Sequence, residues 1–333
     1  MSPSPNRPSS PVAGNKRARS PSDEDLRTAQ AQKTSAAGGR PKARDYDDVT
    51  QEVISLAITL YRCLISTVNA FPDHATELEF IREVWSRACR ELDTFIELTP
   101  TISKLISIRG SHGRGELKTK VKPLIEVTFG FRSGQNKKAI ARNRELVEEL
   151  KEKCTFTFKD IKARKGMYKN GLFQMAANSM WFANQRDEGP SYLEFFNLFP
   201  KPGFALLLTV VESLIDEWAT GIRTDSAFTA KEYRSVYESH LKALQEFEEH
   251  THPHTILENI LVRLHNIGRC IFFLCGLSSD PWHVFSFHSG AQPIEAVSTS
   301  VLSKADLDAA IKEYEDDSGT ETDGECGDND DDE

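Results

Sequence analysis

The stretch RGSHGRGELKTKV, residues 109–121, holds the glycines and cations from which phosphate-binding loops are built. A nucleoside-triphosphate loop needs a Lys directly after its second glycine, followed by a hydroxyl residue that holds magnesium. Gly110 and Gly115 have the required separation, but Glu116 stands where that Lys belongs. The next cation, Lys118, comes two positions later, about 200° further round a helix. The sequence therefore excludes this nucleotide loop.

The dinucleotide-binding pattern GxGxxG fails for a similar reason, because Gly113 and Gly115 would need a third glycine where Lys118 stands. We therefore expect no nucleotide cofactor. A glycine loop that opens a helix still presents free N–H groups and a partial positive charge, which suit a general anion. The sequence predicts such a loop here. The alternative is a helix that turns a charged face to water.

Positive charge is concentrated around this stretch. Residues 104–169 carry eighteen Lys and Arg against seven acids, although the formal charge of the whole chain is −9. If these cations share a face, they can neutralise nucleic-acid phosphates with little preference for base sequence. The predicted phosphate contacts are Arg40 and Lys42 near the N-terminus and Arg109, Arg114, Lys118, Lys120, Lys122, Lys137 and Lys138 in the body. Simple solvation of charged helix faces is the alternative.

Two groups of side chains could in principle bind a metal. Glu212 and Asp216, four residues apart, share a helix face, and paired carboxylates can hold magnesium for phosphodiester chemistry. His250, His252 and His254 alternate in EEHTHPHT, but structural zinc needs four ligands and no partner set is evident. We expect a solvated helix edge in the first case and a surface loop in the second. No catalytic residue, metal or cofactor is predicted, and an enzyme is not expected.

The N-terminal arm, residues 1–44, is rich in Ser, Pro, Ala and Gly and carries nine Lys and Arg against three acids. It has too few large apolar residues to offset the entropy of ordering, so we expect it to be disordered. Its two basic clusters are typical of nuclear import signals: Lys16, Arg17 and Arg19 in the first, and Arg40, Lys42 and Arg44 in the second. The second, GGRPKAR, also resembles half of a minor-groove-binding arm.

The C-terminal segment, residues 304–333, has the opposite charge, with fourteen acids against two Lys. A short amphipathic piece, SKADLDAAIKEYE, leads into a run of acids whose mutual repulsion favours an extended chain. We expect a mostly disordered acidic tail. Such a tail can bind basic nuclear proteins or fold back on a basic surface and compete with nucleic acid; solubility alone is the other interpretation.

The region between these tails, residues 45–303, has a globular composition and helical periodicity. Helices are predicted over 49–68, 74–95, 201–221 and 254–274, after residue 229, and near 137–153 and 171–184. The stripe of 74–95 is expected to bury Phe95. Gly221 is expected to cap a helix, and Thr229 with Glu232 to form a capping box. We predict one all-α domain of about eight helices.

The composition also indicates in which cellular compartment the protein is located. The six cysteines are scattered without a CxxC pair, which favours small core residues in a reducing compartment. The N-terminus lacks the apolar segment of a secretory signal. The longest apolar runs, FALLLTVV and CIFFLCGL, are shorter than the ~18 residues of a membrane span. We expect a chain that is not secreted, has no membrane partner, and is located in the nucleus or in nucleus and cytoplasm.

Three motifs carry a resemblance to a known family: RGELKTKV…FGF, GMYKN…FQMAANSMWF and LIDEWATGIRTDSAFTAKEYRSVYESHL. Together they span roughly residues 106–244 and resemble a large fungal family, abundant in mushrooms and their relatives, whose shared domain has no assigned function. The resemblance implies a helical nuclear or cytosolic fungal protein and supplies no catalytic residues.

Taken together, these features predict a non-enzymatic nuclear interaction module that binds nucleic acid or chromatin without sequence preference. A protein–protein scaffold whose charges only maintain solubility is the first alternative. A metal-dependent enzyme acting on nucleic acid is the second.

Overall fold

The structure is a computed structural model that describes residue 31 and residues 42–134, 136–275 and 302–318. Every regular element in these ranges is a helix, which confirms the predicted all-α domain. Eleven α-helices are present there. The number exceeds the expected eight partly because α6 (Glu188–Ser191) and α7 (Leu193–Phe196) are single turns, and partly because the acidic segment contributes α11 (Lys304–Ser318).

The N-terminal half of the domain packs three long helices around one apolar cluster. These are α1 (Asp48–Thr67), α2 (His74–Glu91) and the first half of α3 (Pro100–Phe129). Asp47 and Asp73 begin α1 and α2 by accepting hydrogen bonds from backbone N–H groups of the first turn. Phe95 lies beyond the end of α2 and is 58% exposed, so its predicted burial is wrong.

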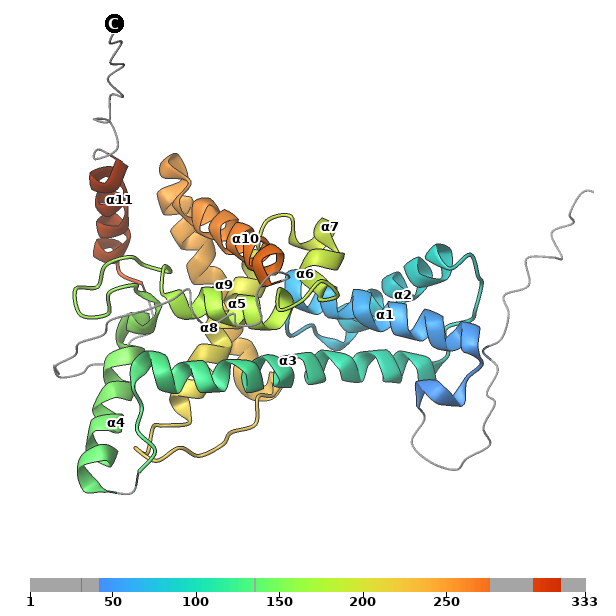
Figure 1. Cartoon of the computed structure of the whole chain (residues 1–333), viewed down its shortest axis with the longest axis horizontal. Helices are drawn as coiled ribbons and strands as arrows, with labels where there is room; N and C mark the ends of the chain where they lie inside the picture. The colour runs from blue at the N-terminus through green and yellow to red at the C-terminus, as the bar shows by residue number, and fades with distance from the viewer. Residues whose placement is uncertain (1–30, 32–41, 135, 276–301, 319–333) are drawn as a thin grey trace, which may run out of the picture.

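The glycine stretch is the middle of α3 and not a loop (Figure 1). The predicted helix-opening anion loop is therefore wrong, because the backbone N–H groups of these glycines lie inside a continuous helix. Gly110 packs closely on α1, since a Cβ there would meet the Tyr61 ring at 3.3 Å. The helix begins instead after Thr99, whose hydroxyl caps its first turn, and ends at Gly130 with φ +73°.

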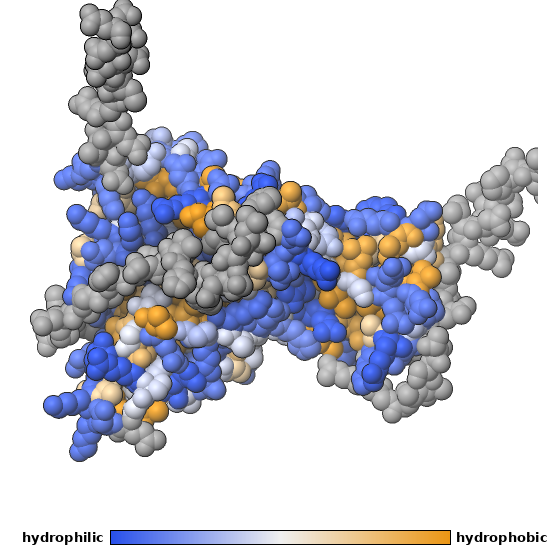
Figure 2. Space-filling view, in the orientation of Figure 1, coloured by the Kyte–Doolittle hydropathy of each residue, from blue (hydrophilic) through white to orange (hydrophobic). Residues whose placement is uncertain are grey.

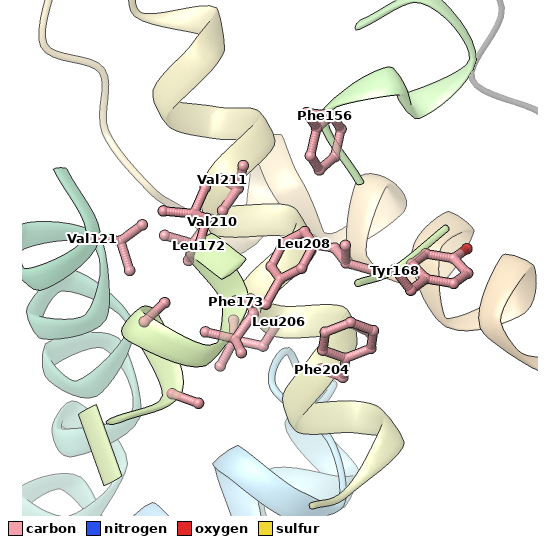
Figure 3. Packing of buried hydrophobic residues seen from close by; sticks show 14 of the residues in the cluster. Val121, Phe156, Tyr168, Leu172, Phe173, Phe204, Leu206, Leu208, Val210 and Val211 are labelled. Atoms are coloured by element: carbon pink, nitrogen blue, oxygen red, sulfur yellow. The ribbon is translucent and has the colours of Figure 1, made fainter. Parts of the chain in front are cut away.

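The second apolar cluster surrounds α8 (Lys201–Asp216), in which every residue from Gly203 to Ile215 is buried. The helices packed around it are the second half of α3, α4 (Lys137–Lys151), α5 (Gly171–Trp181), α9 (Ala230–Thr251) and α10 (Ile256–Cys275). Figure 3 shows Phe173 of α5 and Phe204 of α8 within this core, together with Tyr168 from the preceding loop. Because α3 contributes to both clusters, the described chain forms one domain.

The helix ends predicted from the sequence agree with the structure in part. Pro202 stands in the first turn of α8, as expected. Gly221 does have left-handed backbone, with φ +82°, but α8 has already ended at Asp216. Thr229 is the N-cap residue of α9, as predicted, yet its hydroxyl bonds to the Glu232 carboxylate at 3.1 Å and makes no bond to the backbone.

Three short 3₁₀-helices complete the described elements: η2 (Ala43–Asp45), η3 (Glu152–Thr157) and η4 (His252–His254). The described cysteine side chains have the expected core role at Cys63, Cys89 and Cys154, which are buried free thiols, whereas Cys270 is exposed. Among the described helices, α1 alone is long and apolar enough to cross a membrane, and 56% of that span is buried inside the domain, as in the core helix of a globular protein.

Candidate functional site

Lys118 was predicted to contact phosphate, but its side chain is enclosed within the protein. Its ammonium lies 2.8 Å from a Glu217 carboxylate oxygen, and the two side chains are 10% and 2% exposed. It also donates to the carbonyl and hydroxyl oxygens of Ser226, at 2.7 and 3.1 Å. Glu217 in turn accepts from the Ser226 backbone N–H. This buried ion pair joins α3 to the connection between α8 and α9.

Two further ion pairs continue the same junction toward the end of α3. Lys122 contacts Asp225 at 2.5 Å, and Arg223 pairs with Glu126. We call the three pairs that join α3 to residues 217–225 the α3 ion-pair cluster. The three residues that pair with α3 are Glu217, Arg223 and Asp225. They belong to the motif LIDEWATGIRTDSAFTAKEY, the most specific of the three family motifs. The charges of this motif therefore hold helices together.

Lys120 and Arg114 also have partners inside the protein. Lys120 lies 2.8 Å from Glu116, which also binds Arg62 of α1 at 2.9 Å. Glu116 therefore occupies the position of a phosphate-loop Lys and neutralises neighbouring cations. Burial lowers the pKa of Arg114, whose guanidinium lies 4.8 Å from the centre of the Phe71 ring and donates to a backbone carbonyl.

Arg109 is the exception among the cations of this stretch, because it is exposed and has no ion pair with any described residue. It borders a shallow, open surface depression between α1 and α3, which is also lined by Ser55, Arg62 and His112. This position is far from Lys137. The twenty-one residues of α3 from Arg109 to Phe129 alone span about 30 Å.

Lys137 and Lys138 lie in the first turn of α4, and both are exposed. Residues 131–144 contain three further cations, Arg132, Arg142 and Arg144, and no acid. No carboxylate of the described chain lies within ion-pair distance of these five side chains, which we call the basic end. In Figure 1 the first turn of α4 forms a tip of the molecule, and Figure 2 shows hydrophilic side chains over that tip.

Buried polar contacts fix the shape of the basic end. Asn143 is fully buried, and its amide donates to the carbonyl oxygens of Arg132 and Gly221, at 3.0 and 2.9 Å. Its side-chain oxygen accepts from the Arg132 N–H. Gly221 packs so closely on α4 that a Cβ there would meet the Ile140 carbonyl oxygen at 2.3 Å. Arg142 and Arg144 donate to carbonyl oxygens and therefore keep their net charge.

The remaining predicted cations belong to the N-terminal arm. Lys42 and Arg44 are exposed at η2, beside α1 and at the opposite end of α3 from α4 (Figure 1). Lys16, Arg17, Arg19 and Arg40 lie outside the described residues. The nine predicted phosphate contacts therefore do not share one face. Arg132, Arg142 and Arg144 were missed, although the absence of acids over residues 131–144 could have indicated them.

The carboxylates that could have held a metal have protein partners. Lys151 lies 2.5 Å from Asp216 and 3.5 Å from Glu212, and His240 Nε2 lies 2.7 Å from Glu212. Burial alone would raise the pKa of Glu212, but the hydrogen bond and charge of His240, and then Lys151, hold it below the ordinary value. For Asp216 burial prevails and raises the pKa. No cluster of metal-binding side chains occurs in the described part of the chain.

Two of the three alternating histidines, His250 and His254, face α11. His250 Nε2 lies 2.8 Å from Asp308, and His254 Nε2 lies 3.5 Å from Glu315. The expected surface position of EEHTHPHT is confirmed for His252, which is exposed. The acidic segment thus begins with a helix that packs on the domain, so folded structure continues past residue 303 to Ser318.

The comparisons with known proteins give one match. No curated protein and no solved structure matches the chain. A family model described as a domain of unknown function, DUF6532, matches residues 56–247, more than half of the chain. The matched range begins within α1, ends within α9, and includes the α3 ion-pair cluster and the basic end. It also contains all three motifs that carried the resemblance to an uncharacterised family, and the chain therefore belongs to the DUF6532 family.

Proposed function

We propose that this protein is a non-enzymatic nuclear interaction module that binds the phosphate backbone of nucleic acid through the basic end. The observation that supports this proposal most strongly is the charge balance of residues 131–144. Five cations lie there without an acid in the segment and without an ion pair in the described chain. Exposed lysines and arginines of this kind bind phosphates without reading bases.

The geometry favours the basic end over the other predicted cations. Lys118, Lys120 and Lys122 already have carboxylate partners, so contact with phosphate would require an ion pair to break. Lys137 and Lys138 need no such exchange. They also stand in the first turn of α4, where the helix dipole adds to the positive potential and no acid opposes it.

The N-terminal arm has two roles in this proposal. Its clusters at residues 16–19 and 40–44 would direct nuclear import, and Arg40 with Lys42 would add phosphate contacts. Lys42 and the basic end lie at opposite ends of α3, whose thirty residues span about 45 Å. A duplex of roughly fifteen base pairs or more is therefore needed to reach both, at about 3.4 Å per pair.

The experiment is fluorescence anisotropy with a labelled 24-base-pair duplex and a single-stranded RNA, using the full chain over a salt series. The variant Lys137→Ala/Lys138→Ala is expected to bind more weakly at every salt concentration. The slope of log affinity against log salt on the duplex is expected to become shallower by roughly 1.8, because each phosphate that the variant no longer neutralises accounts for about 0.9.

The matched control is Lys104→Ala/Lys231→Ala, which removes two exposed lysines that have no ion pair with the described residues and lie outside the basic end. This control is expected to keep the wild-type slope. Equal losses in both variants would mean that net charge alone matters. Absence of binding by the full chain at low salt would reject the proposal in favour of a protein–protein scaffold.

A further inference from the structure

The helix α11 has a regular arrangement of apolar and acidic residues. Leu307, Ile311 and Tyr314 follow the i, i+4, i+7 spacing of one helix face and pack against the second apolar cluster. With 100° per residue, Asp306 and Glu313 fall on one side of that stripe, and Asp308 and Glu315 fall on the other side. The helix thus carries an apolar stripe between two rows of carboxylates.

The first row of carboxylates contacts the loop between η3 and α5. Asp306 lies 3.3 Å from the Arg164 guanidinium, and Glu313 accepts a hydrogen bond of 2.9 Å from the Gly166 backbone N–H. Arg164 is itself held in place, because it lies 4.9 Å from the centre of the Phe158 ring and donates to the Thr155 hydroxyl. In Figure 1 this loop lies at the base of α11.

The second row contacts the end of α9 and η4. His250 binds Asp308 at 2.8 Å, and His254 lies 3.5 Å from Glu315. The ring of His254 also lies 5.8 Å from the ring of Tyr314, next to the apolar stripe. The domain therefore presents donors on both sides of an apolar strip: Arg164 and Gly166 on one side and His250 and His254 on the other. We call these four residues, with the strip between them, the α11 site.

We propose that the α11 site is a docking site for an acidic amphipathic helix of a partner protein, and that α11 fills it in cis. The pattern that the site recognises is [DE]-Φ-[DE]-x-x-Φ-x-[DE]-Φ-[DE], where Φ is apolar, as read from residues 306–315. Charge complementarity on two flanks selects this class of helix. A helix with acids on one flank only would leave half of the donors without a partner.

The α11 contacts are of a kind that can exchange. The described polar contacts join exposed or half-buried side chains, apart from the single backbone donor at Gly166. Twenty-six residues separate Cys275 from Leu302, so α11 is tied to the domain by a segment long enough to let it leave the site. A second copy of α11 makes the same contacts but lacks the tether, so it competes poorly. A partner helix that extends the pattern can compete.

The test measures the binding of a labelled peptide of residues 302–318 to the full chain. Leu307→Asp/Ile311→Asp places two charges in the apolar stripe of α11 and should free the site. The control, Ala305→Asp/Ala309→Asp, adds the same two charges to exposed positions on the opposite face. The peptide is expected to bind the first variant at least tenfold more tightly than the wild type or the control. Adding His250→Ala/His254→Ala to the first variant should reverse most of that gain.

Three results would overturn the proposal: no binding to the freed site, equal binding of a scrambled peptide, or a gain that His250→Ala/His254→Ala leaves unchanged. Light scattering tests whether the α11 site is occupied by α11 from a second copy of this protein. If the wild type forms dimers that Leu307→Asp/Ile311→Asp abolishes, the occupant in trans is α11 of another molecule, and the partner-protein proposal fails.

A second measurement uses only the wild-type chain. An unlabelled peptide with the recognition pattern, but other residues at the x positions, should displace α11. Hydrogen exchange of residues 304–318 should then speed up, while exchange in α8 stays unchanged. Unchanged exchange in α11 at saturating peptide would also reject the proposal.

Discussion

The middle of α3 and the start of α4 are both rich in cations, yet the structure uses the two segments differently. In the middle of α3, Lys118 and Lys120 face Glu217 and Glu116, and the charges are neutralised within the domain. At the basic end, Lys137 and Lys138 face solvent without a carboxylate of the described chain nearby. Local composition alone therefore does not define a binding surface. What differs is the position of the acids that the fold brings close.

The difference arises from where the two segments lie in the fold. Lys118 is enclosed between α3 and the α8–α9 connection, so without Glu217 its charge would lose its hydration without compensation. The first turn of α4 is at a tip of the molecule, where water solvates a cation at no cost. A search for ligand-binding cations in this family should therefore begin with those that have no acidic neighbour in the fold.

The largest expected effect comes from breaking the buried ion pair of α3. Lys118→Ala leaves Glu217, which is 2% exposed, as an uncompensated charge in the core. We expect a loss of about 3–5 kcal/mol in the free energy of unfolding, measured by urea denaturation. Lys122→Ala is the matched control. Its partner Asp225 is 71% exposed, so the expected loss is no more than about 1 kcal/mol. Similar losses would show that Lys118 is solvated like Lys122.

Gly221→Ala tests how the basic end is held in place. The left-handed backbone alone costs a non-glycine residue about 1–3 kcal/mol, and the new Cβ would also approach the Ile140 carbonyl oxygen in α4 to 2.3 Å. We expect a clear decrease in the urea midpoint and faster hydrogen exchange at the start of α4. Wild-type exchange in α4 would contradict the role of Gly221 in positioning this helix.

Gly113→Ala and Gly115→Ala test whether the glycine stretch is helical in solution. A Cβ at either position meets no atom within 4 Å, and alanine is favoured over glycine in a helix interior. Each substitution is expected to stabilise the protein by roughly 0.5–1 kcal/mol. Destabilisation by both would instead support a loop, and with it the anion-binding role that the structure removes.

The smallest effect concerns the acid that replaces a phosphate-loop Lys. Burial alone would raise the pKa of Glu116, but its bonds to Lys120 and Arg62 prevail and lower it. A lowered folded pKa adds stability above the unfolded value, near 4.3, and this stability is lost as the pH falls through the folded value. Glu116→Gln should therefore lower the urea midpoint at pH 7 and converge with the wild type at the acidic end. A constant difference at all pH values would contradict this.

The helical fold was predictable because the long helices have strong periodicity and clear first turns, as at Pro202 and Thr229. The continuation of α3 through the glycine stretch could not be predicted from the sequence. Three glycines in six residues favour a loop locally, whereas packing on Tyr61 and the ion pairs to residues 217–225 favour a helix. The buried ion pair of Lys118 was not predictable for the same reason, since Glu217, the acid that neutralises it, lies 99 positions further along the chain.

The shared helix α3 also bears on how the protein unfolds. Its first half belongs to the cluster with α1 and α2, and its second half belongs to the cluster around α8. The two clusters cannot move apart unless α3, a continuous helix of thirty residues, breaks between them. The two halves should therefore unfold in one cooperative transition, with equal midpoints for the tryptophans Trp85 and Trp181, one in each half. The helix propensity of α3 is low both in its glycine-rich middle and at Pro123 in its second half, so this coupling is weakest at these two places.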